Sequence, residues 1–171
     1  MSTLRTVSLV ATTAAVSVLG TLGVLRLRSG APEESAPDRE AMVHEMGGTV
    51  MPFALDSTKH VFEMTATGGV QDVVARNPGD SAQIRLVRQH LRHEAMQFGN
   101  GDFSDPMSLH GKDMPGLKEL SEGAGKVHVE YSDLADGGRI TFTTSDVALL
   151  TALHRWFGAQ LSDHGADATY R

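Results

Sequence analysis

The sequence predicts an α+β fold made of duplicated ββα units, preceded by an N-terminal hydrophobic helix. Two pairs of short stretches alternate apolar and polar residues, one pair within 59–75 and the other within 126–144. Each pair contains a Gly-Gly, at Gly68-Gly69 and Gly137-Gly138, where a hairpin turn is expected. A capped amphipathic helix follows each pair. We therefore expect a four-stranded antiparallel sheet with two helices on one face.

The first 29 residues are predicted to be a signal peptide or a membrane anchor. Residues 7–25 carry no charge, and a helix of that length, at ~1.5 Å per residue, roughly spans the hydrocarbon core of a bilayer. The nearby small-x-small cleavage site, Ser29-Gly30-Ala31, is followed by Pro32, which slightly favours an uncleaved anchor. We expect an exported chain that is either membrane-anchored and facing outside the cytoplasm or secreted.

The rest of the chain divides into three predicted parts. Residues 30–50 are rich in Pro, Glu, Ser and Gly, a composition typical of a flexible linker. The α+β domain is expected at 51–165. Residues 166–171 are expected to be a polar tail.

Charge and cysteine content exclude several classes of partner and site. All 21 acidic residues lie after residue 31, whereas three of the 15 Lys and Arg residues lie before it. The folded part is therefore acidic, which disfavours nucleic acid and anionic lipid as its partners. The chain contains no cysteine, so thiolate metal sites, iron–sulfur clusters and cysteine nucleophiles are excluded.

The first predicted helix, from Ser81 to about Phe98, carries two candidate metal ligands. Asp80 is expected to cap it. The predicted apolar stripe is Ile84, Val87, Leu91, Ala95 and Phe98. His90 and His93 lie away from that stripe and are neighbours on the helix surface. Two imidazoles at this spacing can chelate one cation; the alternative is a solvated helix flank.

The second predicted helix, from Asp146 to about Ser162, contains a candidate buried histidine. Its predicted apolar stripe is Val147, Leu150, His154, Phe157 and Leu161. A buried imidazole needs partners for its nitrogens, so we expect His154 to bond to the backbone or to a carboxylate, with a metal or haem bond as the rarer alternative. Trp156 lies on a second apolar row, which favours contact on two sides, as in a homodimer.

The remaining candidate ligands are His60, His110, Met114 and His164. His110 and Met114 lie in a Gly- and Pro-containing loop of the kind that often frames sites. Eight His and eight Met in a cysteine-free exported chain favour copper, because imidazole and thioether suit both of its oxidation states. Zinc and haem are less favoured, and Met residues also fill cores as adaptable apolar groups.

Enzyme signatures are missing from the sequence. It contains no Gly-x-Ser-x-Gly, no phosphate-binding Gly-x-x-x-x-Gly-Lys-Ser/Thr, no Gly-x-Gly-x-x-Gly and no His-Glu-x-x-His. The favoured function is therefore binding or sensing of a transition metal, copper preferred. The alternative is a metal-free protein-interaction or dimerisation module, and a small enzyme is the weakest reading.

Five stretches carry a resemblance to a protein group: Thr58-Lys-His-Val-Phe, Thr67-Gly-Gly-Val-Gln, Gly101-Asp-Phe-Ser-Asp-Pro, Met114-Pro-Gly-Leu and Leu153-His-Arg-Trp-Phe. In these, the chain resembles small exported bacterial proteins of unknown function, which often bear the name aspartate carbamoyltransferase. The Ser-Thr-Arg-Thr and His-Pro-x-Gln motifs of that enzyme family do not occur here. The chain is also too short for its two-lobed fold, so that activity is not expected.

Overall fold

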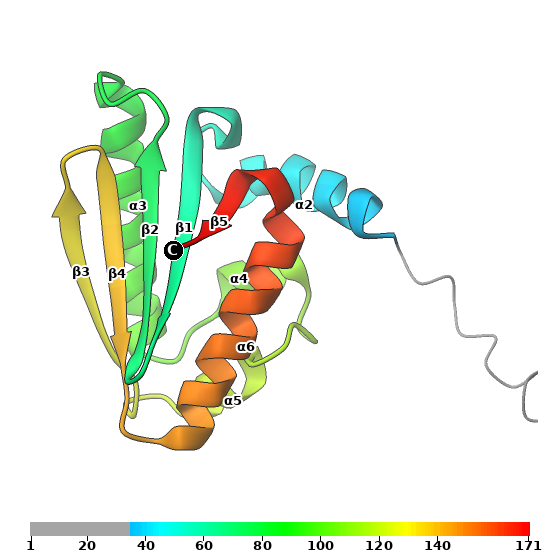
Figure 1. The fold of residues 1–171 in the computed structure, drawn as a ribbon, viewed down its shortest axis with the longest axis vertical. Helices are drawn as coiled ribbons and strands as arrows, with labels where there is room; N and C mark the ends of the chain where they lie inside the picture. Colours follow the sequence, from blue (N-terminus) through cyan, green and yellow to red (C-terminus); the bar gives the residue numbers. More distant parts are fainter. Residues whose placement is uncertain (1–34) are drawn as a thin grey trace, which may run out of the picture. The chain divides into compact units, whose positions relative to one another are not determined.

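A computed structural model describes residues 35–171 of the chain as an α+β fold (Figure 1). In this range it has five α-helices, one five-stranded mixed sheet and two 3-10 turns. The helices are α2 (Ala36–Val50), α3 (Ser81–Gly99), α4 (Ser104–His110), α5 (Leu117–Glu122) and α6 (Val147–His164). The strands are β1 (Thr58–Thr65), β2 (Gly68–Ala75), β3 (His128–Leu134), β4 (Gly137–Thr143) and β5 (Ala168–Tyr170), with 3-10 turns at Leu55–Ser57 and Gly165–Asp167.

The predicted N-terminal hydrophobic helix lies outside the described residues, as do the signal peptide or anchor at 1–29 and the start of the predicted linker. None of the helices in 35–171 has the length and apolar character needed to cross a membrane.

The sheet contains the four expected antiparallel strands and one strand that was not expected. Its order is β3-β4-β2-β1-β5, and the β1–β2, β2–β4 and β3–β4 pairs are antiparallel. Strand β5 adds to β1 in parallel, with Ala168 beside His60. The expectation of a polar tail at 166–171 was therefore wrong: Gly165 turns the chain after α6 with a positive φ of 48°, and Ala168 is buried at the sheet edge.

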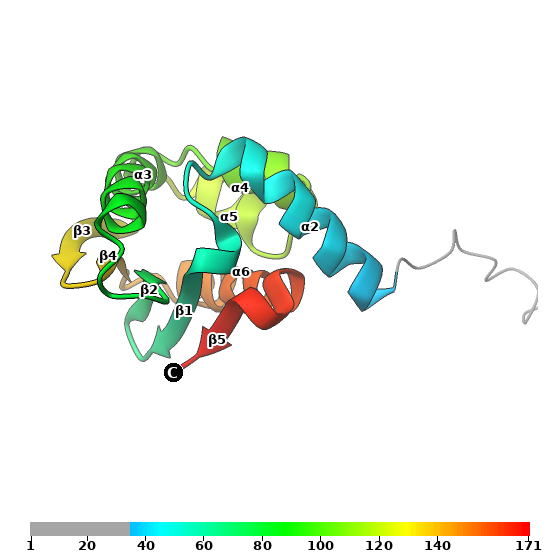
Figure 2. The same cartoon turned by 90° about the horizontal axis from the view of Figure 1, so that it is seen from above.

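Helices α3 and α6 both cover one face of the sheet (Figure 2), as the sequence predicted. Each helix packs mainly on the hairpin of the other ββα unit. Helix α3 lies on β3 and β4, whereas α6 lies against β2, β1 and β5. This crosswise packing joins the two units in one hydrophobic core.

An aromatic cluster around Trp156 forms the centre of this core. Trp156 is fully buried, and its ring centroid lies 5.4–5.8 Å from those of four phenylalanines. These are Phe98, Phe103, Phe142 and Phe157. The apolar stripe predicted for the second helix was therefore only partly right, because Phe157 is fully buried but Val147 is 75% exposed, and the row with Leu149, Leu153 and Trp156 is buried.

The two Gly-Gly pairs do not form the hairpin turns. The turns are Ala66-Thr67 and Ala135-Asp136, and each Gly pair opens the strand that follows. A Cβ atom at Gly68 would lie 1.8 Å from the carbonyl oxygen of Phe142, and one at Gly137 would lie 1.9 Å from that of Val73. Glycine is needed at both positions because the backbones of β2 and β4 approach closely there.

Residues 36–50 form helix α2 and not the flexible linker that composition predicted. The side chain of Ser35 accepts a hydrogen bond from the Asp38 amide at the start of the helix, and proline stands at the favourable second position. Val43, on the side that packs against the domain, is fully buried. Packing of this one face stabilises a helix that its polar composition alone would not.

Replacing Gly137 with alanine should destabilise the chain by about 3 kcal/mol, because the added methyl group would overlap the backbone of β2. Urea unfolding of the full chain, followed by the fluorescence of Trp156, measures this. Gly48→Ala is the control, since nothing lies within 4 Å of its added Cβ atom and alanine favours a helix. Equal stability of Gly137→Ala and wild type would contradict the close approach of the strands.

Candidate functional site

The candidate site lies between α3 and α6, which run in opposite directions across the sheet (Figure 1). The Phe98 ring of α3 packs edge-on against the Trp156 ring of α6, with centroids 5.5 Å apart. Residues four apart lie on the same face of a helix. One turn from that aromatic pair, Glu94 therefore lies level with Gln160. A further turn along, His90 lies level with His164.

The space between these two rows is a partly open cavity of about 40 Å³, enough for roughly three water molecules. The inner face of the sheet contributes His60 and Gln71 to its wall, and α4 contributes Asp105 and His110. Val50 and Met51, at the end of α2, line it from another side. Five elements that are far apart in the sequence therefore meet at one polar cavity.

Three imidazoles gather at one end of this cavity. The rings of His60 and His164 are stacked, with centroids 4.8 Å apart and an interplanar angle of 13°. The His110 ring stands edge-on to His164 at 5.0 Å. Burial, with the neighbouring imidazoles, lowers the pKa of His60 well below its ordinary value, and burial is the main reason that the pKa values of His164 and His90 fall to about 4. These rings are therefore uncharged at neutral pH and keep a free nitrogen lone pair.

The buried carboxylate of Asp163 fixes the ring of His110. His110 Nδ1 lies 2.9 Å from Asp163 Oδ2, and Arg39 of α2 donates to both Asp163 oxygens at 2.6 Å. Burial alone would raise the pKa of Asp163, but the hydrogen bonds and charges of Arg39 and His110 hold it below its ordinary value. Burial likewise lowers the pKa of His110. The neutral ring therefore donates Nδ1–H to the carboxylate, which leaves Nε2 unprotonated.

The carboxyl group of Glu94 is held in its neutral form. Burial raises its pKa to about 9, and the hydrogen bond and charge of Asp105 act in the same direction. At neutral pH the cavity wall formed by α3 and α6 therefore carries neither a charged imidazole nor a charged Glu94.

Unpartnered polar atoms are concentrated around this cavity. Seven buried side-chain nitrogen and oxygen atoms in 35–171 have no hydrogen-bond partner, and five of them belong to residues that line it. These five are His60 Nδ1, Gln71 Oε1, Glu94 Oε1, Trp156 Nε1 and Gln160 Oε1. Each such atom costs about 1–3 kcal/mol when it is left dry. The cavity is therefore built to surround a polar occupant.

The spacing of the imidazoles fits a shared metal ion, but the orientation of their rings does not. With metal–nitrogen bonds near 2 Å and tetrahedral angles, rings that share one ion lie with centroids about 5 Å apart. The observed centroid separations, 4.8 and 5.0 Å, match this value. The parallel rings of His60 and His164 do not point nitrogens at one place, and no group of three His, Asp or Glu side chains within 35–171 is arranged to hold an ion. Rotation of one ring would be required.

The structure brings together four of the seven predicted ligands, since His60, His90, His110 and His164 all line the cavity. His93 is exposed on the outer side of α3, so it is separated from His90. His154 is half-buried, and its Nε2 lies 2.8 Å from the carbonyl oxygen of Gly68, which is the backbone partner that the sequence led us to expect. Met114 is buried beside an outer hollow next to His110 and does not line the cavity.

Three residues of the site were not predicted, namely Gln71, Asp163 and Gln160. The signal that could have found Gln160 is the row Trp156, Gln160 and His164, spaced four apart on α6. A buried amide within a helix row that also holds tryptophan and histidine indicates a polar cavity. Asp163 had no such signal, because its partners come from α2 and α4.

Comparisons with known proteins assign this chain to no family. No protein-family model, no curated protein and no solved structure shows significant similarity to it.

The stability of the protein should be greatest between pH 6.5 and 7. Below pH 6.5 these four histidines bind protons in the unfolded chain, whereas in the folded protein their buried imidazoles stay neutral. The stability therefore falls as the pH drops towards 4. Above pH 4.5 the folded Glu94 keeps a proton that the unfolded chain has lost, so stability also falls as the pH rises towards 9. Urea unfolding from pH 4 to 9 measures both limbs.

The acid limb should be the steeper one, because several imidazoles act there and a single carboxyl acts on the alkaline side. Glu94→Gln imitates the neutral carboxyl and should flatten the alkaline limb alone. A wild-type stability that rises steadily from pH 6.5 to 9 would contradict a neutral buried Glu94.

Replacing the amides of the cavity with apolar groups should stabilise the empty protein. Gln71→Leu and Gln160→Leu each remove a buried amide oxygen that has no hydrogen-bond partner, and we expect a gain of about 1 kcal/mol for each. Gln83→Leu is the matched control, because Gln83 Oε1 accepts from the Ala54 amide at 2.9 Å and its loss should destabilise. Urea unfolding compares the three. Destabilisation by both cavity variants would show that these amides have structural partners.

Proposed function

We propose that this chain is an exported domain that binds a transition-metal ion, copper preferred, at the imidazole end of the cavity between α3 and α6. The observation that carries the proposal is the group of His60, His110 and His164, with ring centroids at the spacing of a shared ion. The role that fits is binding or sensing, with the segment at 1–29 as the export signal or membrane attachment.

The protonation of these imidazoles supports a metal. Neutral nitrogen is the form that binds metal ions, and burial keeps these rings neutral. The hydrogen bond from His110 to Asp163 is the arrangement that commonly orients a metal-binding histidine and strengthens it as a ligand. Three neutral imidazoles leave the charge of a bound ion uncompensated, so a single charge costs less to bury than a double one, which favours the cuprous ion.

The other end of the cavity would surround the coordination position of the ion that no protein ligand fills. Gln160 lies one helical turn from His164, and Gln71 lies on the strand beside His60. Amides and the Trp156 indole are neutral donors and acceptors that can hold a water molecule or another small ligand bound to the ion. Sites that exchange a ligand keep such a position, whereas purely structural sites are closed by four protein ligands.

The face of the sheet away from α3 and α6 gives the interaction-module alternative no specific support. It carries Asp72, which accepts from Arg139 at 2.7 and 2.8 Å and from Arg171 at 3.2 Å. This polar network interrupts the half-buried valines of β1 and β2, so the apolar patch expected of a dimer interface is not formed there.

Cuprous titration of the full chain under reducing conditions, against a chromophoric chelator, tests the proposal. We expect one tight site in wild type and a loss of at least 100-fold in affinity for His60→Gln and His164→Ala. Asp163→Asn should cost about 10–100-fold, because it removes the group that orients His110. A parallel zinc titration compares the two metals.

The matched controls are His93→Ala and His128→Ala, which remove exposed imidazoles and should bind as wild type does. Circular dichroism and Trp156 emission confirm that each variant is folded. Wild-type protein that binds neither metal, or that loses binding only in the control variants, would end the proposal.

A further inference from the structure

We propose that the free edge of strand β3 binds an acidic, extended segment of a partner protein, which joins the sheet as a sixth strand. The segment lies in the groove between β3 and α3, with its carboxylates against the arginines of that helix. None of the residues that line this groove lines the cavity between α3 and α6. The docking site and the proposed metal site are therefore separate.

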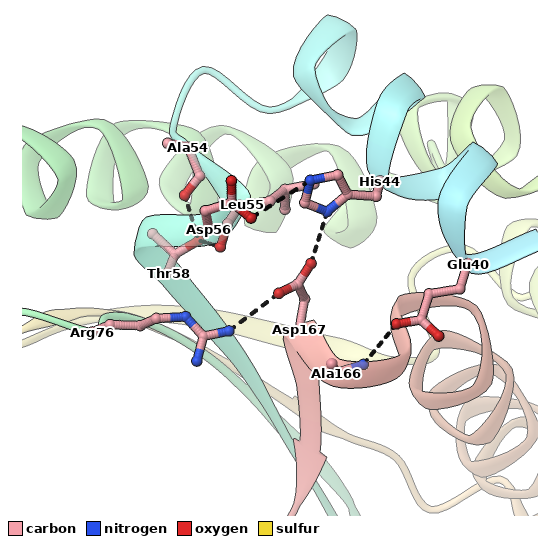
Figure 3. A network of polar contacts seen from close by, with 9 residues as sticks. All are labelled: Glu40, His44, Ala54, Leu55, Asp56, Thr58, Arg76, Ala166 and Asp167. Carbon is pink, nitrogen blue, oxygen red and sulfur yellow. Dashed lines mark hydrogen bonds and ion pairs between the residues drawn. The ribbon is translucent and has the colours of Figure 1, made fainter. Parts of the chain in front are cut away.

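The two edges of the sheet differ in what they leave open (Figure 1). At one edge β5 spans only three residues, and its start is tied down, because Asp167 accepts from Arg76 at 3.1 Å and lies 2.9 Å from His44 Nδ1 (Figure 3). At the other edge β3 spans seven residues and pairs with β4 alone within residues 35–171. Alternate residues of such a strand direct their backbone N–H and C=O groups away from the sheet. Strand β3 is therefore the edge at which a further strand can pair.

A shallow groove runs along β3 on the face of the sheet that α3 covers. It consists of two hollows of about 570 and 590 Å³, which meet at Arg92. The larger hollow is lined mainly by apolar groups, among them Ala95, Met96 and Val129. Met96 is 60% exposed, and exposed methionines are typical of surfaces that adapt to a bound apolar side chain. This end of the groove therefore fits apolar residues of the added strand.

The other hollow is basic. Arg85, Arg88 and Arg92 follow one another at three- and four-residue spacing along one side of α3, and all three line it. Arg85 is exposed and has no hydrogen-bond or ion-pair partner within residues 35–171. Arg88 donates to the carbonyl oxygen of Gly137 at 3.0 Å, and Arg92 lies 4.9 Å from the centroid of the Tyr131 ring. Guanidinium groups that are held in place in this way are pre-organised for carboxylates.

One carboxylate already faces these arginines. Asp133 of β3 lies 3.3 Å from Arg92 and 3.9 Å from Arg88, and within residues 35–171 it is the only acidic side chain paired with them. Two of the three guanidinium charges are left without compensation, although the folded part as a whole is acidic. A complementary strand therefore brings further carboxylates to this hollow.

The same charges disfavour a second copy of this chain at this edge. Helix α3 packs on β3 and β4, so two copies paired through β3 would place their α3 helices next to each other. The arginines of both helices would then face one another, and like charges so placed exclude a partner. An acidic segment of another protein is therefore the occupant that this surface favours.

The alternation of strands sets the pattern of that segment. Side chains two residues apart point to the same face of a sheet, so every second residue of the added strand faces the groove. Strand β3 runs from Val129, beside the apolar hollow, towards Ala135, beside the basic one. In antiparallel pairing, which is slightly more stable than parallel pairing, the acidic residues of the segment come first. The expected pattern is acidic-x-acidic-x-apolar-x-apolar.

Binding of a defined peptide to the full chain tests the docking site. The probe is fluorescein-labelled Glu-Thr-Glu-Thr-Val-Thr-Val amide, and its fluorescence anisotropy reports binding. We expect a Kd below about 1 mM that rises with added salt. The matched probe with Lys in place of both Glu residues should bind at least tenfold more weakly. Absence of binding by the acidic probe at about 1 mM, or equal binding of the two probes, would overturn the proposal.

Charge reversal in the protein locates the binding. Arg85→Glu should weaken binding of the acidic probe at least tenfold and strengthen binding of the lysine probe, with an unchanged urea midpoint because Arg85 has no partner to lose. Arg155→Glu is the matched control: it reverses an exposed arginine of α6 that lies 3.0 Å from Glu119 and should bind both probes as wild type does. Equal effects of the two reversals would show that only net charge matters and would reject the groove.

Two N-methylated probes test the pairing of backbones. In an added strand only alternate N–H groups donate to β3, so methylation of the three Thr nitrogens and methylation of the other alternate set should differ. One set should abolish binding and the other should leave it, and any other result rejects strand addition. Sedimentation of the full chain covers the remaining occupant: a dimer that excludes the acidic probe assigns this edge to a second copy and overturns the proposal.

Discussion

The carboxylate of Asp163 is the constraint on which the arrangement of the described domain depends. It lies on α6, accepts two hydrogen bonds from Arg39 on α2 and faces Nδ1 of His110 on α4. A buried carboxylate is tolerated only when its charge is compensated, and here the partners come from α2 and α4, which also pack on each other. One side chain therefore helps to position α2, α4 and an imidazole of the site together.

The crosswise packing of the two ββα units explains how a polar cavity survives inside a domain of this size. Each helix lies on the hairpin of the other unit, so the two helix rows meet over the centre of the sheet. One end of the rows is aromatic, with Phe98 against Trp156, and supplies a large part of the hydrophobic burial. The other end can then hold polar groups that lower the stability of the folded domain when they are buried without a hydrogen-bond partner. Such local losses of stability are characteristic of binding sites.

The periodicity of the sequence correctly predicted those features that depend on residues close to one another in the chain. The buried stripe of α3, the cap at Asp80 and the backbone hydrogen bond of His154 follow from spacing and from the need of buried polar groups for partners. The orientation of His90 and His93 was beyond such rules, because His90 packs against residues that are distant in the sequence: the Phe53 ring lies edge-on to it at 5.6 Å, and Asp105 of α4 lines the same cavity. The fifth strand was missed for the same reason: three residues at 168–170 carry no periodicity, and only the edge of β1 makes them a strand.

The shared carboxylate also links occupancy of the cavity to the position of α2. Any occupant that binds Nε2 of His110 fixes that ring, and a fixed ring holds Asp163 where Arg39 reaches both of its oxygens. An occupied cavity then favours the position of α2 seen in this structure. Linkage requires the converse, so α2 held in this position must raise the affinity of the cavity by the same factor. Residues 36–50 thus act on the site through a single buried charge, without contributing a ligand to it.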